Sequence, residues 1–212
     1  MAGAGRGRVD KRRAIVEAAF EVFARRGYEL ASMQDVAEQA GVSKQTVYNH
    51  FQDKPEVFAE AMAVTADAVL AANLEAVELL RNPGADLRAA LNEAAFAMLR
   101  ICCDPRSTAL RSLTYAQRAR FPELVDVIQN RLAGRLGPAV ADRLARLALS
   151  GDLRPCDPEQ AAEQLLALLT APVEARSRMG TRPVPDPDIK SIAEAATDTF
   201  LRAYAPSAPA SV

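Results

Sequence analysis

Residues 41–54 read GVSKQTVYNHFQDK, and this stretch decides the fold. Ser43 is a good helix N-cap, because its hydroxyl can accept a hydrogen bond from a backbone amide of the first turn. Val47 and Phe51 stand four residues apart, so they lie on one face of a short helix and point inward. Gly41 makes the turn before that helix. The remaining side chains of the stretch are polar and are left to point outward.

Two helices are predicted before this stretch. The first runs over residues 10–26 and ends at Gly27, with Tyr28 placed to pack back against it. The second begins after Ser32, whose hydroxyl can cap it, and Asp35 favours the N-terminus three residues later. Because the helix after Ser43 is too short to be stable alone, the first two helices must hold it through apolar contacts. The second and third helices, joined by a glycine turn, make a helix-turn-helix.

Helical periodicity continues along the chain, and no segment shows the period of 2 that is typical of strands. Further helices are predicted over 54–81 and 87–104, through Leu110 and Leu113, over 122–150 with a kink or short break at Gly137-Pro138, from 158 through Val173, and over 189–204. The predicted fold class is therefore all-α. We divide the chain into a flexible basic arm (1–9), a three-helix helix-turn-helix domain (10–53), a larger helical domain (54–205) and a disordered tail (206–212).

Composition excludes several classes of protein. The chain has 212 residues and is 50% apolar, enough for a sizeable core. Its net charge of -1 and pI of about 6.0 do not demand nucleic acid or membrane as a partner. The three cysteines and the single histidine, His50, offer neither a disulfide framework nor a zinc site of the usual spacing. With no signal-peptide pattern and no uncharged run near ~18 residues, we predict a cytoplasmic protein without metal or cofactor.

The outward side chains of the third helix indicate a function. They are Lys44, Gln45, Thr46, Tyr48, Asn49 and His50. Such groups donate to phosphate oxygens or contact base edges in the major groove of DNA. The near-neutral total also hides a local charge, because five basic residues in 6–13 oppose only Asp10, a net charge of +4. His50 could instead bond within the fold, and a basic arm is often only solvated.

The same residues resemble a known family. The N-terminal domain of TetR-family transcriptional regulators is similar to this chain at Phe23, Gly27-Tyr28, Ser32, Val36-Ala37, Ala40-Gly41-Val42-Ser43, Tyr48, Phe51, Lys54 and Phe58. The resemblance covers roughly residues 10–58, and a weaker one, to a common C-terminal type of the family, lies in the stretch RFPEL at 120–124. It implies a homodimer whose third helices enter successive major grooves of a near-palindromic operator, with half-sites about 34 to 36 Å apart.

The resemblance also implies roles for single residues in DNA binding. Phosphate would be held mainly by Ser32, Lys44, Thr46, Tyr48, His50 and Lys54. Arg8 and Arg12 would meet the backbone or the minor groove, and Ser43 completes the DNA-binding set. Gln45 is the predicted base contact, most naturally to adenine, with Tyr48 touching a thymine methyl group and Asn49 as a further candidate.

For the larger domain, the resemblance implies a small-molecule pocket and a dimer contact made by the last two helices. The pocket candidates are Met98, Cys102, Tyr115, Leu124, Ile128, Leu165 and Leu169. The dimer candidates are Leu165, Leu166, Leu169, Ile192, Ala196 and Phe200. The apolar pocket set favours a mainly apolar ligand. Core packing explains these residues equally well, and Cys102-Cys103 could be a redox switch, although adjacent cysteines bond only with strain.

The sequence therefore predicts a DNA-binding transcriptional regulator, and we choose a repressor that a small apolar ligand releases from its operator. The helix over 54–81 would connect the two sites. Two other interpretations stay open: a ligand-independent or architectural DNA-binding protein, and a helical carrier or enzyme with an incidental helix-turn-helix. No nucleophile with a partner histidine, no metal cluster and no phosphate loop supports an enzyme. Ligand, operator and regulated genes cannot be read from the sequence.

Overall fold

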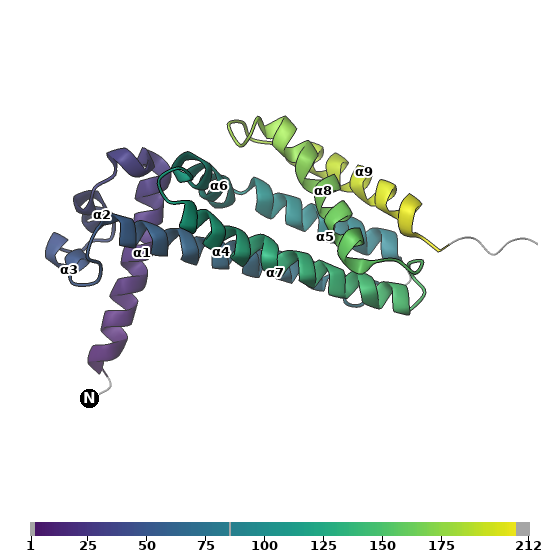
Figure 1. Cartoon of the computed structure of the whole chain (residues 1–212), viewed down its shortest axis with the longest axis horizontal. Coiled ribbons are helices and arrows are strands. Elements are labelled where there is room, and N and C mark those ends of the chain that lie inside the picture. The colour runs from purple at the N-terminus through teal and green to yellow at the C-terminus, as the bar shows by residue number, and fades with distance from the viewer. Residues whose placement is uncertain (1–2, 85, 207–212) are drawn as a thin grey trace, which may run out of the picture. The chain divides into compact units, whose positions relative to one another are not determined.

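The computed structural model describes residues 3–84 and 86–206, with side chains from Val9 onward (Figure 1). Within these residues every regular element is a helix, which confirms the all-α fold class. The helices are α1 (Gly3–Leu30), α2 (Met33–Gln39), α3 (Lys44–Tyr48), α4 (Lys54–Glu78), α5 (Leu87–Cys103), α6 (Pro105–Gln117), α7 (Pro122–Leu149), α8 (Pro158–Ser177) and α9 (Asp186–Tyr204). They form two compact units, one of residues 3–68 and 109–131 and one of 69–108 and 132–206.

The N-terminal helix is longer than predicted. α1 already begins at Gly3, so the segment 3–9, expected to be a flexible arm, is helical. Gly27 interrupts the helix with φ 74° and ψ 164°, a conformation that glycine adopts without steric cost, and this is where the sequence predicts the end. Tyr28 then turns into the core, where only 2% of it is exposed. Residues 1 and 2 of the predicted arm and 207–212 of the predicted tail lie outside the described residues.

Local hydrogen bonds start α2 and α3 where the sequence predicts. The Ser32 hydroxyl accepts from the Asp35 amide at 3.1 Å, and the Asp35 carboxylate accepts from the Ser32 amide at 2.9 Å. This reciprocal pair is a capping box. The Ser43 hydroxyl accepts from the Thr46 amide at 3.1 Å and caps α3. Both N-cap predictions are confirmed.

An aromatic cluster lies at the centre of the first unit. We call Phe23, Tyr28, Phe58 and Phe121 the aromatic cluster. The Tyr28 ring centroid is 4.8 Å from that of Phe58 and 5.1 Å from that of Phe121, both edge to face. Phe121 comes from the turn between α6 and α7, far along the chain from the other rings. The predicted division at residue 54 is therefore not where the compact units divide, because the rings hold 109–131 with the N-terminal helices.

The long helix α4 contributes to both units, up to Ala68 in the first and from Val69 in the second. Among the described residues it is the one helix whose length and hydropathy would also suit a membrane span. A core helix passes the same test, and Phe58 and Met62 are fully buried in the first unit. In that unit its carboxylates are also paired, Glu60 with Arg12 and Asp67 with Arg131.

The second unit is built around α5, α8 and α9, which pack on one another (Figure 1). Its core contains Leu91 and Leu99 of α5, Leu144 of α7 and Phe200 of α9.

α7 was predicted to be kinked or broken at Gly137-Pro138. The structure has one uninterrupted helix through Pro138, and apolar positions at helical spacing continue on both sides of it.

Candidate nucleic-acid interface

The third helix presents its polar side to solvent, as the spacing of its apolar residues predicts. Val47 is completely buried and Phe51 is 1% exposed, whereas Tyr48 is 44% exposed. Lys44, Gln45 and Asn49 are also exposed. The Gln45 side-chain amide donates to the Asn49 side-chain oxygen at 3.1 Å, so these two neighbours on the helix surface hold one another. Both have the amide chemistry that pairs with base edges in a major groove.

A hollow of about 400 Å³ opens beside α3. It is lined by Ala31, Ser32, Met33, Gln34, Lys44, Tyr48, Gln52, Asp53 and Lys54. Four of the predicted phosphate contacts thus meet in one place: the α2 cap Ser32, Lys44 and Tyr48 of α3, and Lys54 at the start of α4. Two lysines, a phenol and a hydroxyl around one hollow suit the oxygens of a phosphate backbone.

Gln34 and Gln52 line the same hollow, and sequence reasoning missed both. Each is exposed and has an amide that can donate to phosphate. A local signal existed for Gln34, because it is the second residue after the Ser32 cap and so lies in the first turn of α2. For Gln52 the signal was weaker, since only its place next to the buried Phe51 marked it.

Lys54 is fixed more firmly than a surface lysine. Its ammonium group donates to the Glu29 carbonyl at 3.1 Å and lies 4.4 Å from the centre of the Tyr28 ring. Partial burial lowers the pKa of Lys54, and burial raises the pKa of Tyr28. A cation held in this way has already lost side-chain freedom, so it is pre-organised for an anion at the hollow.

Other residues predicted to contact DNA are partly buried or use their polar groups in hydrogen bonds within the protein. The hydroxyls of Ser43 and Thr46 lie 2.8 Å apart and belong to the α3 cap. His50 is half-buried at the end of α3. Arg12 pairs with Glu60 and donates to the His50 carbonyl, so its guanidinium group faces the protein. The side chain of Arg8 lies outside those that the structure describes.

Comparison with known proteins identifies the family. The family model for bacterial regulatory proteins of the TetR family matches residues 15–61, which contain the caps, the turn and α3. A second model, described as the C-terminal domain of AefR-like transcriptional repressors, matches residues 89–206, more than half of the chain.

The chain belongs to the TetR family of transcriptional regulators.

Similar proteins among the solved structures and the curated sequences cover 77% to 97% of this chain. The crystal structure of a TetR-family regulator from Mesorhizobium loti MAFF303099 is 28% identical with a TM-score of 0.86, over 93% of this chain and 98% of that one. The flavonoid-responsive regulator FrrA is 25% identical with a TM-score of 0.66, over 97% and 100%. The HTH-type regulator YhgD of Bacillus subtilis (strain 168) is 26% identical over 77% of this chain and 82% of its own. This TetR-family chain is a DNA-binding transcriptional regulator.

The residues predicted for the TetR-family ligand pocket fall into both units. Tyr115, Leu124 and Ile128 belong to the first, where the two aliphatic residues are buried and Tyr115 is 47% exposed. In the second, the core includes Met98, Leu165 and Leu169, with Cys102 packed against it. A pocket that contains all of them stays a prediction.

The cysteines are free thiols, and among the described residues no three His, Cys, Asp or Glu side chains are placed to hold one metal ion.

The last two helices bury most of the residues predicted for the TetR-family dimer contact inside the chain's own core. These are Leu165, Leu169, Ile192, Ala196 and Phe200, each 4% exposed or less, while Leu166 is half-buried. Apolar periodicity identified the inward stripe of α8 and α9, because core packing and dimer packing use the same residue types. Little of these five side chains is exposed in the single chain, and their place in a dimer contact stays a prediction.

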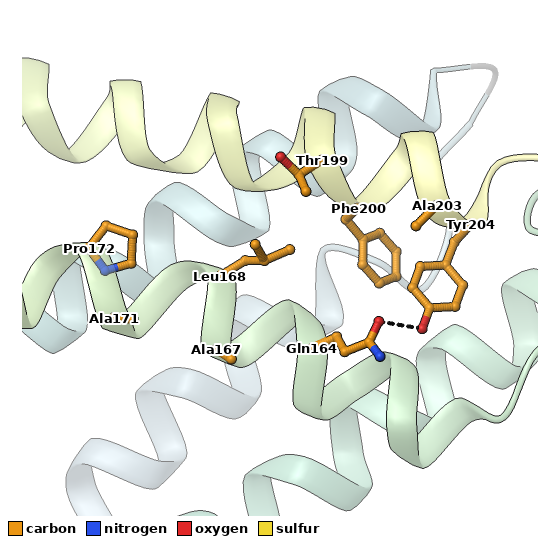
Figure 2. A pocket seen from close by; sticks show the side chains of 9 residues that line it. All are labelled: Gln164, Ala167, Leu168, Ala171, Pro172, Thr199, Phe200, Ala203 and Tyr204. Atoms are coloured by element: carbon orange, nitrogen blue, oxygen red, sulfur yellow. Dashed lines mark hydrogen bonds between the residues drawn. The ribbon is translucent and has the colours of Figure 1, made fainter.

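A different face of α8 and α9 remains open. A groove of about 460 Å³ is lined by Gln164, Ala167, Leu168, Ala171, Pro172, Thr199, Phe200, Ala203 and Tyr204 (Figure 2). The rings of Phe200 and Tyr204 stack with centroids 4.7 Å apart and are directed from α9 toward α8. The Tyr204 hydroxyl donates to the Gln164 side-chain oxygen at 2.7 Å and closes one end of the groove. Three alanines, Leu168 and Pro172 make the rest of the lining mainly apolar, with Thr199 as the other polar residue.

Proposed function

We propose that this chain is a cytoplasmic, homodimeric repressor that holds a near-palindromic operator through α3 of both copies and is released by a small, mainly apolar ligand. One observation carries the DNA-binding half of this proposal: Ser32, Lys44, Tyr48 and Lys54 surround one hollow beside the exposed side of α3. Phosphate contacts there would set the register of the helix, and Gln45 would then contact a base edge.

Repression is supported by the C-terminal half of the chain. The model that matches residues 89–206 describes a transcriptional repressor domain. A mainly apolar ligand is consistent with the predicted pocket residues, which are aliphatic or, at Met98, a thioether, apart from the thiol of Cys102 and the phenol of Tyr115. The relative FrrA is described as flavonoid-responsive, so flat aromatic compounds are a reasonable first class to test.

The groove between α8 and α9 is the proposed contact with the second copy. Ala167, Ala171 and Ala203 are exposed alanines, which let another helix approach closely. The stacked rings of Phe200 and Tyr204 lie at the base of the groove and are only 1% and 5% exposed, so the alanines would make most of the contact. In this proposal the contact uses the outward side of the same two helices, and Phe200 is the residue that the groove shares with the set predicted from sequence.

The RFPEL stretch supports a route by which a ligand signal would reach the DNA-binding residues. Arg120 and Phe121 belong to the matched C-terminal domain, but both lie against Tyr28 in the first unit, 4.9 and 5.1 Å from its ring centroid. Arg120 also pairs with Glu29 at 2.8 Å. Lys54 contacts the same two residues, through the Tyr28 ring and the Glu29 carbonyl. A shift of 120–121 would thus displace a proposed phosphate contact.

The test is ligand-induced release from DNA. A selected operator duplex bearing a fluorophore is titrated with the full chain, and a panel of apolar compounds that includes flavonoids is screened for loss of the complex. The proposal expects at least one compound that lowers operator affinity and also raises the melting temperature of the free chain. A Phe121→Leu variant should bind the operator but be released less readily. Operator binding that no compound changes, with no thermal stabilisation by any, would favour a ligand-independent regulator.

A further inference from the structure

Arg12 on α1 uses most of its guanidinium group inside the fold. Its Nε donates to Glu60 Oε1 at 2.9 Å, and its Nη2 pairs with Glu60 Oε2. Its Nη1 donates to the backbone carbonyl of His50 at 2.8 Å. The guanidinium carbon lies 4.3 Å from the centre of the Phe51 ring. One side chain therefore ties α1 to α4 and to the end of α3.

These contacts fall where α3 has little support of its own. The helix spans only Lys44–Tyr48, and a helix of this length is unstable in isolation. Its N-terminus has the Ser43 cap, but the last carbonyls of a helix have no partner within the helix. The His50 carbonyl lies just after the Asn49 C-cap, and Arg12 gives it a charged donor. A cation at this end also complements the helix dipole.

Glu60 fixes the direction in which Arg12 points. A bidentate pair between a guanidinium group and a carboxylate has a planar geometry that lysine cannot reproduce. The two side chains are 38% and 32% exposed, so the pair is partly shielded from water. The remaining contact, the face of Phe51, belongs to a residue that is 1% exposed and anchors α3 in the core.

We propose that Arg12 is a positioning residue for DNA recognition: it fixes the C-terminal end of the recognition helix and is not itself a phosphate contact. This inference rests on the proposed operator binding, and it replaces the role that the local charge of the N-terminus predicted for Arg12. Arg13, the next residue, provides a contrast. It pairs with Glu17 on its own helix at 3.8 Å and is 73% exposed.

The test compares the operator affinity of the full-length wild type with that of three variants at fixed salt: Arg12→Lys, Glu60→Gln and Arg13→Lys. A positioning role predicts that Arg12→Lys weakens specific binding about tenfold or more, although the charge is kept, because its bonds to Glu60 and His50 are lost. Glu60→Gln should also weaken binding. A phosphate contact predicts near-wild-type affinity for Arg12→Lys and tighter binding for Glu60→Gln, since a negative charge near DNA is removed. Either of these results would overturn the proposal.

Hydrogen exchange of the α3 amides, measured without DNA, provides an independent measurement. Arg12→Lys should speed the exchange of the Val47 and Tyr48 amides relative to Arg13→Lys, while the amides of α5 and α9 stay unchanged. Equal exchange in the two variants would also contradict a positioning role. If the wild type binds no operator, the proposed function fails, whereas this measurement still shows whether Arg12 holds α3.

Discussion

Gln45 and Lys44 are neighbours on α3, and they suit different parts of DNA: Gln45 a base edge and Lys44 a phosphate. Gln45 is exposed, and a 3.1 Å hydrogen bond from its side-chain amide to the Asn49 side-chain oxygen orients the amide. An amide can bind an adenine edge in two places at once, whereas an ammonium group meets phosphate as a point charge. Sequence preference should therefore depend on Gln45, and overall affinity on Lys44.

Replacing these two residues separates the roles. Gln45→Ala should reduce discrimination at one base pair of each half-site by about 1 to 3 kcal/mol and leave the salt dependence unchanged. Lys44→Gln should weaken binding to all sequences and lower the slope of log affinity against log salt by about one for each copy bound. Binding constants for the operator and its single-base variants, measured over a range of salt, give both quantities. An unchanged preference in Gln45→Ala would remove Gln45 from the base-contacting residues.

Which residues can be recognised from sequence depends on how local their partners are. The capping roles of Ser32 and Ser43 were predicted correctly, because each hydroxyl bonds to an amide three residues along the chain. Arg12 was assigned to DNA because it belongs to a basic segment. Its partner Glu60 is 48 residues away, and no local pattern distinguishes a paired cation from a solvated one.

Among the elements, α2 depends on its capping box for a well-defined start. The Asp35 carboxylate accepts from the Ser32 hydroxyl at 2.7 Å, and that hydrogen bond is the main reason why the pKa of Asp35 lies below its ordinary value. The positive charge of Arg26, 3.2 Å away, acts in the same direction. Because the folded-state pKa is lowered, the charged form stabilises the fold at neutral pH.

This pKa shift predicts a pH-dependent stability difference. Asp35→Asn should lower the free energy of unfolding at pH 7. The difference from wild type should shrink as the pH falls below about 4, where the carboxylate becomes protonated in the unfolded and then in the folded state. Denaturant unfolding between pH 3 and 7 measures it, with Asp126→Asn, at an exposed carboxylate of α7, as the control. A difference that stays constant down to pH 3 would show that the charge of Asp35 does not matter.

Elements whose ends are encoded locally were predicted well, and their packing was predicted less well. The starts of α2, α3 and α8 follow from capping residues next to them. The packing of Phe121 against Tyr28 and Phe58 connects segments that are about 60 to 90 residues apart, and periodicity says only that Phe121 is apolar. For the same reason, the inward and outward stripes of α8 and α9 could not be distinguished before the core was known.

At the scale of the whole molecule, the proposed repressor must be a dimer, because one α3 occupies one half-site. Ala171 lines the α8–α9 groove and is exposed, so it can be changed without opening the core. A charge placed there would be buried without a partner in the dimer.

Ala171→Glu should therefore shift the protein from dimer to monomer. Ala133→Glu on α7, which adds the same charge to an exposed alanine outside the groove, should leave the dimer intact. Analytical ultracentrifugation over a range of concentrations measures the dissociation constant of each variant, and circular dichroism checks that both are folded. If Ala171→Glu dimerises like the wild type, the second copy binds elsewhere.

Selection of bound duplexes from a random DNA pool, followed by affinity measurements on the enriched sequence over a range of salt, tests the central claim most directly. The account predicts a near-palindrome with half-sites about one helical turn apart, bound by two copies with a steep salt slope. Enrichment of no sequence above non-specific binding would contradict it, because the exposed side of α3 would then not read DNA.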